Sequence, residues 1–251
     1  MPKLVILGTS YSIPDETHEN THMVLVGEDR KVLIDCVSNP IVRLKQAGID
    51  HHDITDVVMT HFHPDHVSGL PLLLMGMGLS ERVNPLNIYG LKYVVDIMKN
   101  MLVDYQWERW HQFPVTFHYL EDQEMFPMLE SEEFRIFTSP VNHFIPTIGM
   151  RIEFTESNQV LAYSCDTTPT KSVVVLGENA DVLIHEAAGA SPGHSSASQA
   201  GEIATKANAK ELYLIHYPTG DFDYHALVDQ AAQTYDGPIR LAEDLMVFEF
   251  E

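Results

Sequence analysis

The feature that most constrains this chain is a run of histidine and aspartate residues directly after a short apolar strand. Residues 56–60 read DVVMT, and the next six residues read HFHPDH. This hexapeptide contains His61, His63, Asp65 and His66. Burying so many polar groups at a strand end costs free energy unless they find partners. Neutral imidazoles and carboxylates are good ligands for Zn²⁺, Mn²⁺ or Fe, so the run predicts a metal site.

The spacing within the hexapeptide predicts ligands for two neighbouring ions. In an extended chain, side chains two residues apart point the same way, so His61 and His63 can share one ion. Pro64 then turns the chain, and Asp65 and His66 project toward a second point. The alternative interpretation is a solvated loop that precedes the helix predicted at residues 67–79.

Further polar residues downstream each follow a predicted buried strand, as His61 does. His143 follows FRIFTSPVN, Asp166 follows QVLAYSC, and His216 follows ELYLI. A carboxylate such as Asp166 can bridge two ions about 3.5–4 Å apart, the separation used in two-metal hydrolysis. Alone, each would be interpreted as a hydrogen-bonded residue at the edge of the core. Together with the hexapeptide, they predict the rest of a ligand set.

Strands and helices alternate along the chain, which predicts an α/β fold. Strands are expected at residues 3–8, 22–28, 31–35, 56–60 and 86–89, in five segments between 115 and 164, and at 181–184, 211–215 and 245–250. Helices are expected at residues 40–47, 67–79, 91–105, 196–207 and 226–232. This order favours two β-sheets with helices outside, a four-layer αββα sandwich. No linker divides the sequence, so we expect one domain over residues 1–251.

Composition excludes several classes of protein. The net charge is −21, and no cluster of lysine or arginine is present, which disfavours nucleic acid and anionic membranes as partners. The chain has only two cysteines, Cys36 and Cys165, so a disulfide framework is not expected. No apolar run approaches the ~20 residues of a membrane helix, and no signal-peptide pattern is recognised. We therefore expect a cytoplasmic protein that does not bind membranes.

These motifs, taken together, resemble the metallo-β-lactamase superfamily, and more closely its ribonuclease Z branch and small phosphodiesterase relatives. The resemblance includes LGTS at residues 7–10, Asp35 at the end of the early hairpin, and DHVSGLP at residues 65–71. It continues with HEAA at residues 185–188 and GHSSASQAGEIA at residues 193–204. The similarity spans nearly the whole chain and implies the metallo-β-lactamase fold.

The resemblance also implies a role for each site residue. It assigns one metal ion to His61, His63 and His143, and the other to Asp65, His66 and His216, with Asp166 as the bridge. It makes His194 the proton donor to the leaving oxygen, oriented by Glu186, while Asp65 would also aim the attacking water. Two divalent ions are implied, with zinc expected first and manganese or iron also suitable. A homodimer is implied as well.

The sequence departs from the ribonuclease Z pattern in two places. That branch inserts a long tRNA-binding arm between the positions of His143 and Asp166, but here only the 22 residues 144–165 separate them. The glycine-rich segment expected after Asp35 is replaced by CVSNP at residues 36–40. Both departures argue against tRNA processing.

The function expected first is therefore a dinuclear metal-dependent phosphodiesterase that acts on small or cyclic phosphodiesters. The alternatives are a tRNA 3′-end endonuclease, a hydrolase of a lactone, thioester or β-lactam, and a metal-binding protein without enzymatic activity. His194 favours phosphodiester over acyl chemistry, because carbonyl hydrolysis on this fold needs no such donor. The expected partner is a small-molecule phosphodiester.

Overall fold

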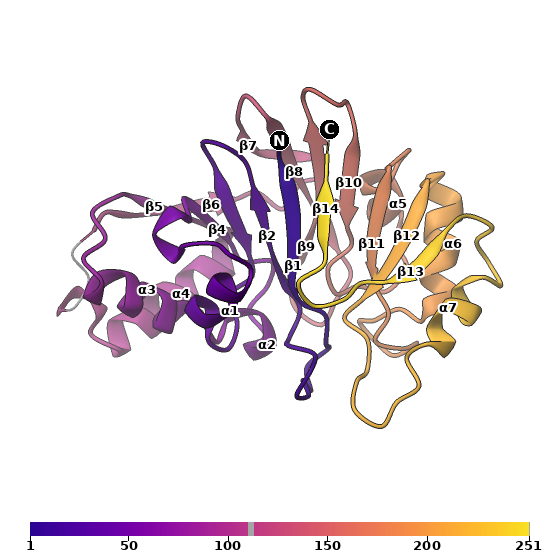
Figure 1. Ribbon diagram of the computed structural model, residues 1–251, viewed down its shortest axis with the longest axis horizontal. Helices are drawn as coiled ribbons and strands as arrows, with labels where there is room; N and C mark the ends of the chain where they lie inside the picture. Colours follow the sequence, from indigo (N-terminus) through magenta and orange to yellow (C-terminus); the bar gives the residue numbers. More distant parts are fainter. Residues whose placement is uncertain (110–112, 251) are drawn as a thin grey trace.

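The computed structural model describes residues 1–109 and 113–250, which form two mixed β-sheets packed face to face (Figure 1). In the first sheet the strand order is β14-β1-β2-β3-β4-β5-β6. Its strands are β1 (Lys3–Gly8), β2 (His22–Val26), β3 (Lys31–Ile34), β4 (Asp56–Val58), β5 (Leu86–Leu91), β6 (Val115–Leu120) and β14 (Val247–Glu249).

The second sheet has the order β13-β12-β11-β10-β9-β8-β7. Its strands are β7 (Phe126–Glu130), β8 (Phe134–Val141), β9 (Thr147–Phe154), β10 (Val160–Tyr163), β11 (Val182–Glu186), β12 (Glu211–Ile215) and β13 (Ile239–Leu241). The hairpin β9–β10 turns over residues 155–159 alone, so no arm is inserted between the positions of His143 and Asp166.

Helices cover the outer face of each sheet, which confirms the predicted four-layer αββα sandwich (Figure 1). The helices beside the first sheet are α1 (Pro40–Gln46), α2 (Pro64–Val67), α3 (Leu70–Leu79) and α4 (Lys92–Asp104), with the short 3₁₀ turns η1 (His51–Asp53) and η2 (Trp107–Arg109). Those beside the second sheet are α5 (Lys171–Leu176), α6 (Ala197–Ala207) and α7 (Ala226–Ala231).

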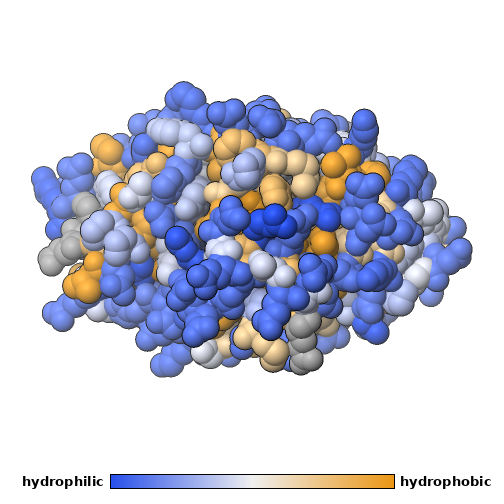
Figure 2. Space-filling view, turned by 90° about the horizontal axis from the view of Figure 1, so that it is seen from above, coloured by the Kyte–Doolittle hydropathy of each residue, from blue (hydrophilic) through white to orange (hydrophobic). Residues whose placement is uncertain are grey.

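The apolar core follows these layers. One buried cluster fills the space between the sheets and continues under the helices of the first sheet, and a smaller one lies between the second sheet and its helices. On the edge that carries the two termini, the surface is mostly hydrophilic and its apolar side chains gather toward the middle (Figure 2). Among the described residues, no helix has both the length and the apolar character needed to cross a bilayer.

The helix predicted at residues 67–79 is in fact two helices, α2 and α3, and the first begins inside the hexapeptide. Pro64 occupies the first turn of α2, where its missing N–H costs nothing. The break falls at Ser68 and Gly69, where the backbone N–H of Gly69 donates to the carbonyl of Cys36 at 2.8 Å and leaves the helical ladder. Residue 69 is glycine because a Cβ there would lie 2.6 Å from the carbonyl carbon of Val37. Asp65 and His66 therefore stand on a helical turn and not on a loop.

Two elements of the second half were not predicted. Helix α5 has the valine-rich sequence KSVVVL, which favours a strand, yet the side chain of Thr170 accepts a hydrogen bond from the backbone N–H of Val173 and caps a helix. Strand β13 has only three residues, too few to give a periodic pattern.

The sheet topology brings distant strand ends to one edge. Strands β10, β11 and β12 are parallel, and β8 points the same way because two antiparallel pairings separate it from β10. Residues after all four strands therefore meet at the same edge. The first sheet joins them there, since the backbone N–H of Ile148 on β9 donates to the carbonyl of Thr60 after β4, at 3.2 Å.

Candidate metal centre

Three histidine rings meet where β4 and β8 end. His61 and His63 follow β4, and His143 follows β8. Nδ1 of His63 lies 3.1 Å from Nε2 of His61 and 3.0 Å from Nε2 of His143. Nitrogen ligands about 2.0–2.1 Å from one tetrahedral zinc ion lie roughly 3.3 Å apart. Burial lowers the pKa of all three imidazoles, which favours the neutral form that binds metals.

Asp65, His66 and His216 form a second group beside the first. Asp65 and His66 lie on α2, and His216 follows β12. Oδ2 of Asp65 is 3.8 Å from Nε2 of His66 and 3.7 Å from Nε2 of His216. These separations exceed hydrogen-bonding distance, as expected for atoms that would share an ion without bonding to each other.

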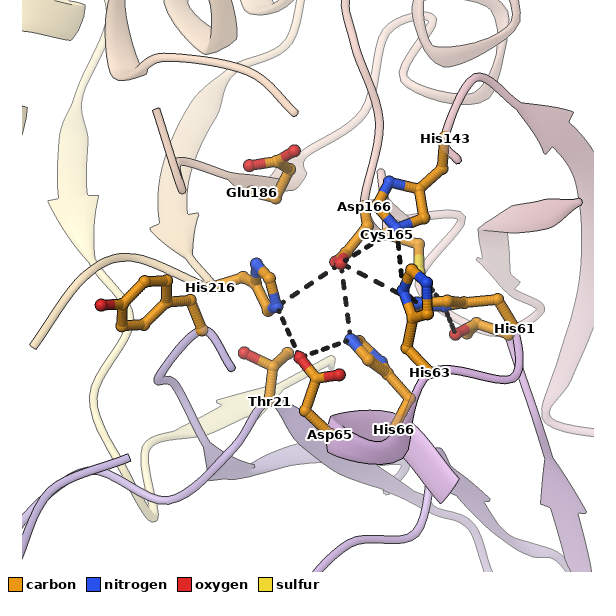
Figure 3. Close-up of polar contacts among 12 residues, drawn as sticks. Thr21, His61, His63, Asp65, His66, His143, Cys165, Asp166, Glu186 and His216 are labelled. Carbon is orange, nitrogen blue, oxygen red and sulfur yellow. Dashed lines mark hydrogen bonds and ion pairs between the residues drawn. The ribbon is translucent and has the colours of Figure 1, made fainter. Parts of the chain in front are cut away.

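Asp166 lies between the two groups (Figure 3). Its Oδ2 is 3.9 Å from Nε2 of both His61 and His143. The same oxygen is 3.6 Å from Nε2 of His66 and 3.5 Å from Nε2 of His216. One carboxylate oxygen therefore faces both sets of imidazoles at similar distances, which is the position of a bridge.

Unpaired polar atoms in this space indicate that the residues fit metal ions. Among the described residues, the buried atoms without a hydrogen-bond partner include Nε2 of His66, Nε2 of His216 and Oδ1 of Asp166. An unsatisfied buried polar atom costs about 1–3 kcal/mol, and most are therefore paired. Divalent cations would satisfy such atoms. We call His61, His63, Asp65, His66, His143, Asp166 and His216 the seven-residue cluster.

Asp35 anchors the cluster through hydrogen bonds to His66 and Thr60. Nδ1 of His66 donates to Oδ2 of Asp35 at 2.7 Å, and the hydroxyl of Thr60 donates to the same oxygen at 2.8 Å. Oγ1 of Thr60 also lies 3.0 Å from Nδ1 of His61 and can accept a hydrogen bond from it, and Sγ of Cys165 lies 3.8 Å from the same nitrogen. These partners fix the tautomer of both rings so that Nε2 points inward.

Left-handed backbone turns place several of these side chains. Asp35, Cys165 and His216 have φ angles of 61°, 53° and 53°, each just after a strand. Such a conformation costs on the order of 1–3 kcal/mol for a residue with a side chain and persists only where the surroundings enforce it. Strained residues of this kind concentrate at functional sites.

Glu186 and His194 form a pair beside the cluster. Glu186 ends β11 and is fully buried, and its Oε1 accepts hydrogen bonds from Nδ1 of His194 at 3.1 Å and from the backbone N–H of Ser195 at 2.9 Å. The backbone N–H groups of Thr167 and Ala188 also donate to this carboxylate. Glu186 therefore fixes the loop that carries His194 as well as the ring itself.

The electrostatics of this pair suit a proton donor. Burial raises the pKa of the Glu186 carboxyl, and the neighbouring imidazole opposes that effect. For His194, burial lowers the pKa, but the hydrogen bond and the charge of Glu186 outweigh it, so the pKa is raised above its ordinary value. A histidine with a raised pKa keeps its proton until a leaving group needs it.

The cluster opens into a pocket of about 500 Å³. A volume of this size suits one small organic ligand. Among the described residues that line it, none is lysine or arginine, and the basic side chains of the lining are His63, His194 and His216. The lining residues are Tyr11, Ser12, His63, Pro64, Asp65, Phe144, Asp166, Ala188, Ser191, His194 and His216.

The structure brings all the sequence-predicted site residues together at this pocket and the cluster behind it. Their catalytic and ligand roles remain predictions. Sequence reasoning matched Asp35 to a motif without giving it a role, and it missed the pocket residues Tyr11 and Phe144, which no local pattern marks. A separate group, Asp50, His51 and His52, lies in η1 and at its start, outside the cluster.

The comparisons with known proteins agree with this geometry. The family model described as Anti-Pycsar protein Apyc1 matches residues 2–235. A protein named ribonuclease Z from Methanothermobacter thermautotrophicus is 26% identical over 304 residues, covering 99% of this chain and 97% of that protein.

Solved structures show the same fold. The metallo-β-lactamase fold protein YhfI from Bacillus subtilis superposes with a TM-score of 0.84 at 24% identity, covering 98% of each chain. A structure described as a new diphosphatase from the PhnP family has a TM-score of 0.78 at 21% identity, covering all of this chain and 98% of that one.

Proposed function

The chain belongs to the Anti-Pycsar protein Apyc1 family, within the ribonuclease Z-like part of the metallo-β-lactamase superfamily, and from that membership we propose a phosphodiesterase for small or cyclic phosphodiesters. Proteins of this superfamily are metal-dependent hydrolases. The proposed unit is one domain over residues 1–251. The observation that carries the proposal is the His194–Glu186 pair, placed where the cluster meets a pocket of about 500 Å³.

We propose that the seven-residue cluster binds two divalent ions. Zinc is the expected metal, and manganese and iron are alternatives. The first ion would be held by His61, His63 and His143, whose nitrogen atoms have the spacing of ligands around one ion. The second would be held by the three residues that surround Oδ2 of Asp65. Asp166 would bridge, since its Oδ2 faces both groups. Bound cations would supply an acidified water and positive charge at the phosphoryl oxygens.

Asp65 is the residue proposed to aim the attacking water. It borders the pocket, and its side chain is 15% exposed, so it can contact both the cluster and the substrate. Burial works to raise the pKa of this carboxyl, but the neighbouring imidazoles of His216 and His66 lower it overall. An ionised Asp65 can accept a hydrogen bond from the water and orient it toward phosphorus.

His194 is proposed to complete the reaction. As the new P–O bond to water forms, the P–O bond to the alcohol breaks, and the leaving oxygen takes the proton from Nε2 of His194. The proton that the attacking water gives up passes to solvent, and His194 takes up a proton from solvent before the next turnover. Glu186 holds Nδ1–H and stabilises the charged ring before transfer. The products are a phosphomonoester and an alcohol, which are parts of one molecule when the substrate is cyclic. General-acid help of this kind contributes about 10²–10⁴-fold to a rate.

Two alternatives remain weaker. The relative named ribonuclease Z suggests RNA cleavage, but this chain joins β9 and β10 by a short turn, carries a net charge of −21, and has no lysine or arginine in the pocket lining. Phosphate backbones bind proteins largely through such cations. Hydrolysis of a lactone or thioester would not need the proton donor that the His194–Glu186 pair provides.

The outer face of α3 supports the proposed homodimer. Residues 70–79 read LPLLLMGMGL, with no charged side chain, and Leu72, Met75 and Leu79 are exposed. A helix that is apolar all round is normally buried on every side. A second copy fits, because an uncharged stripe can meet itself across a twofold axis, whereas other surfaces of two acidic chains repel.

Sedimentation of wild type and of Leu79→Glu tests the proposed dimer. The variant should be monomeric, and a wild-type monomer at micromolar concentration would contradict the dimer.

The experiment that tests the function is a substrate panel on purified protein loaded with zinc or manganese. The panel contains bis-p-nitrophenyl phosphate, a 2′,3′-cyclic nucleotide, a precursor tRNA and a lactone. We expect turnover of the small phosphodiesters and little of the tRNA. Activity on the lactone alone would overturn the proposal, and efficient 3′-end cleavage of the tRNA would replace it with the ribonuclease.

A further inference from the structure

Phe144 occupies an unusual position for a large apolar side chain. It directly follows His143 and lines the pocket, yet it is 62% exposed. The backbone around it belongs to the short loop between β8 and β9. A phenylalanine exposed at the mouth of a pocket contributes little to the core, and its ring is accessible to a molecule that enters the pocket.

The ring packs against its neighbours on one side. It meets His143 edge to face, with centroids 5.1 Å apart at 64°, and His194 in the same way at 6.1 Å and 69°. Gly193 lies close against it: a Cβ there would be 2.9 Å from Cδ2 of Phe144 and equally close to Nδ1 of His143. The carbonyl of Gly193 accepts a hydrogen bond from Nδ1 of His143 at 2.7 Å. The ring is therefore packed on one side and open on the other.

Tyr11 also lines this pocket, from the loop after β1. Its backbone N–H donates to the carbonyl of Tyr217 at 3.2 Å, and its carbonyl accepts from the side chain of Asn20 at 2.7 Å. The loop that carries it is therefore tied down at both sides. The pocket thus offers aromatic surface from two separate segments, together with the hydroxyls of Ser12 and Ser191, and no lysine or arginine.

We propose that Phe144 is a stacking platform that selects phosphodiesters carrying a flat aromatic group and sets the distance of that group from the reacting phosphorus. This inference rests on the proposed function and adds the residue that determines substrate preference. Because the ring contacts both His143 and His194, a group stacked on its open face is positioned relative to a proposed metal ligand and to the proposed acid. Stacking recognises any planar ring, so the selection concerns the presence of the ring and not its identity.

The test compares an aromatic with an aliphatic cyclic phosphodiester. The substrates are adenosine 3′,5′-cyclic monophosphate and glycerol 1,2-cyclic phosphate, and kcat/KM is measured for wild type, Phe144→Leu, Phe144→Tyr and a matched control, Phe222→Leu. Phe222 is also exposed but does not line the pocket. Stacking of one base is worth about 1–3 kcal/mol, so in Phe144→Leu the ratio of the two kcat/KM values should fall about tenfold. Phe144→Tyr and Phe222→Leu should keep the wild-type ratio.

A binding measurement separates this inference from the proposed function. Calorimetry on the metal-loaded protein uses adenosine 5′-monophosphate and glycerol 1-phosphate, neither of which requires turnover. Phe144→Leu should weaken binding of the nucleotide about tenfold relative to that of glycerol phosphate. Equal weakening of both ligands, or of neither, would overturn the stacking role. Absence of turnover on any phosphodiester, with this binding difference intact, would overturn only the proposed function.

Discussion

The first sheet supplies its share of the seven-residue cluster from one hexapeptide, whereas the second sheet supplies His143, Asp166 and His216 from the ends of three separate strands. The first share depends on a local turn and a single helical turn of α2. The second exists only when β8, β10 and β12 lie in register and end at the same edge. One half of the site is therefore specified by a contiguous segment of sequence. The other half forms only when the strands of the second sheet come together.

The largest expected effect comes from removing one ligand from each half. His66→Ala and His216→Ala should both reduce the metal content and bring turnover below detection, because the two histidines would share one ion with Asp65. Metal content by mass spectrometry and turnover of bis-p-nitrophenyl phosphate check this. His52→Ala, from the separate histidine group of η1, is the control and should change neither quantity. Wild-type metal content and turnover in His216→Ala would show that the second sheet does not contribute His216 as a ligand to the ion at His66.

His194→Ala should separate chemistry from metal binding. His194 lies in the assembled half but outside the cluster, so the variant should retain wild-type metal content. We expect kcat to fall about 10²–10⁴-fold, the usual contribution of a general acid. A p-nitrophenolate leaving group needs little protonation, so the loss should be larger on a cyclic nucleotide than on bis-p-nitrophenyl phosphate. An unchanged rate on both substrates would remove the acid role.

Glu186→Gln should have a smaller effect that depends on His194. The amide cannot stabilise a charged ring, and its NH₂ group would face backbone N–H donors, so we expect kcat to fall about tenfold and the free energy of unfolding by about 1–3 kcal/mol. Glu178→Gln, at an exposed position, is the control. In a double-mutant cycle, adding Glu186→Gln to His194→Ala should not lower kcat further. Independent, multiplicative losses would contradict a positioning role.

The smallest effect concerns how the loops of the two halves are joined. Oδ2 of Asp15, in the loop after β1, accepts a hydrogen bond from the backbone N–H of Gly220, in the loop after β12, at 2.9 Å. Burial works against ionisation, but this bond and those from Thr17 and His18 lower the pKa of Asp15 below its ordinary value. A lowered carboxyl pKa in the folded state stabilises the fold above the unfolded-state pKa, and this stabilisation is lost as the pH falls toward the folded-state pKa.

Asp15→Asn should therefore lower the free energy of unfolding by about 1–2 kcal/mol near pH 7. The difference from wild type should be constant above about pH 5 and should shrink progressively as the pH falls below about 4, toward the lowered folded-state pKa. Urea unfolding at several pH values measures it. A difference that does not change with pH would assign the effect to packing and not to the charge.

The fold was predictable where patterns are long and local. Most strands follow from apolar periodicity, as does the helix at α4 with its buried face of Val94, Val95, Met98 and Leu102. The four layers were only favoured by the order of strands and helices, and the family resemblance implied them. The pattern could not show that the predicted helix breaks at Ser68 and Gly69, because that depends on how Gly69 meets the backbone of Cys36 and Val37. Nor could it reveal α5, where capping and packing overcome the strand preference of three valines.

The site divides in the same way. The hexapeptide indicates metal binding on its own, since a solvated loop is a weaker explanation for so many metal-ligating side chains at one strand end. His143, Asp166 and His216 are single polar residues after strands, and only the combined pattern and the family resemblance single them out. Phe144 and Tyr11 have no signal at all, because nothing in one sequence says which exposed loop residues will face the same pocket.

Anomalous diffraction from crystals of the zinc-loaded protein tests the central claim most directly. The account predicts two peaks about 3.5–4 Å apart, one among His61, His63 and His143 and the other among Asp65, His66 and His216, with Asp166 between them. No peak at the cluster, or a single peak at Asp50, His51 and His52, would contradict it.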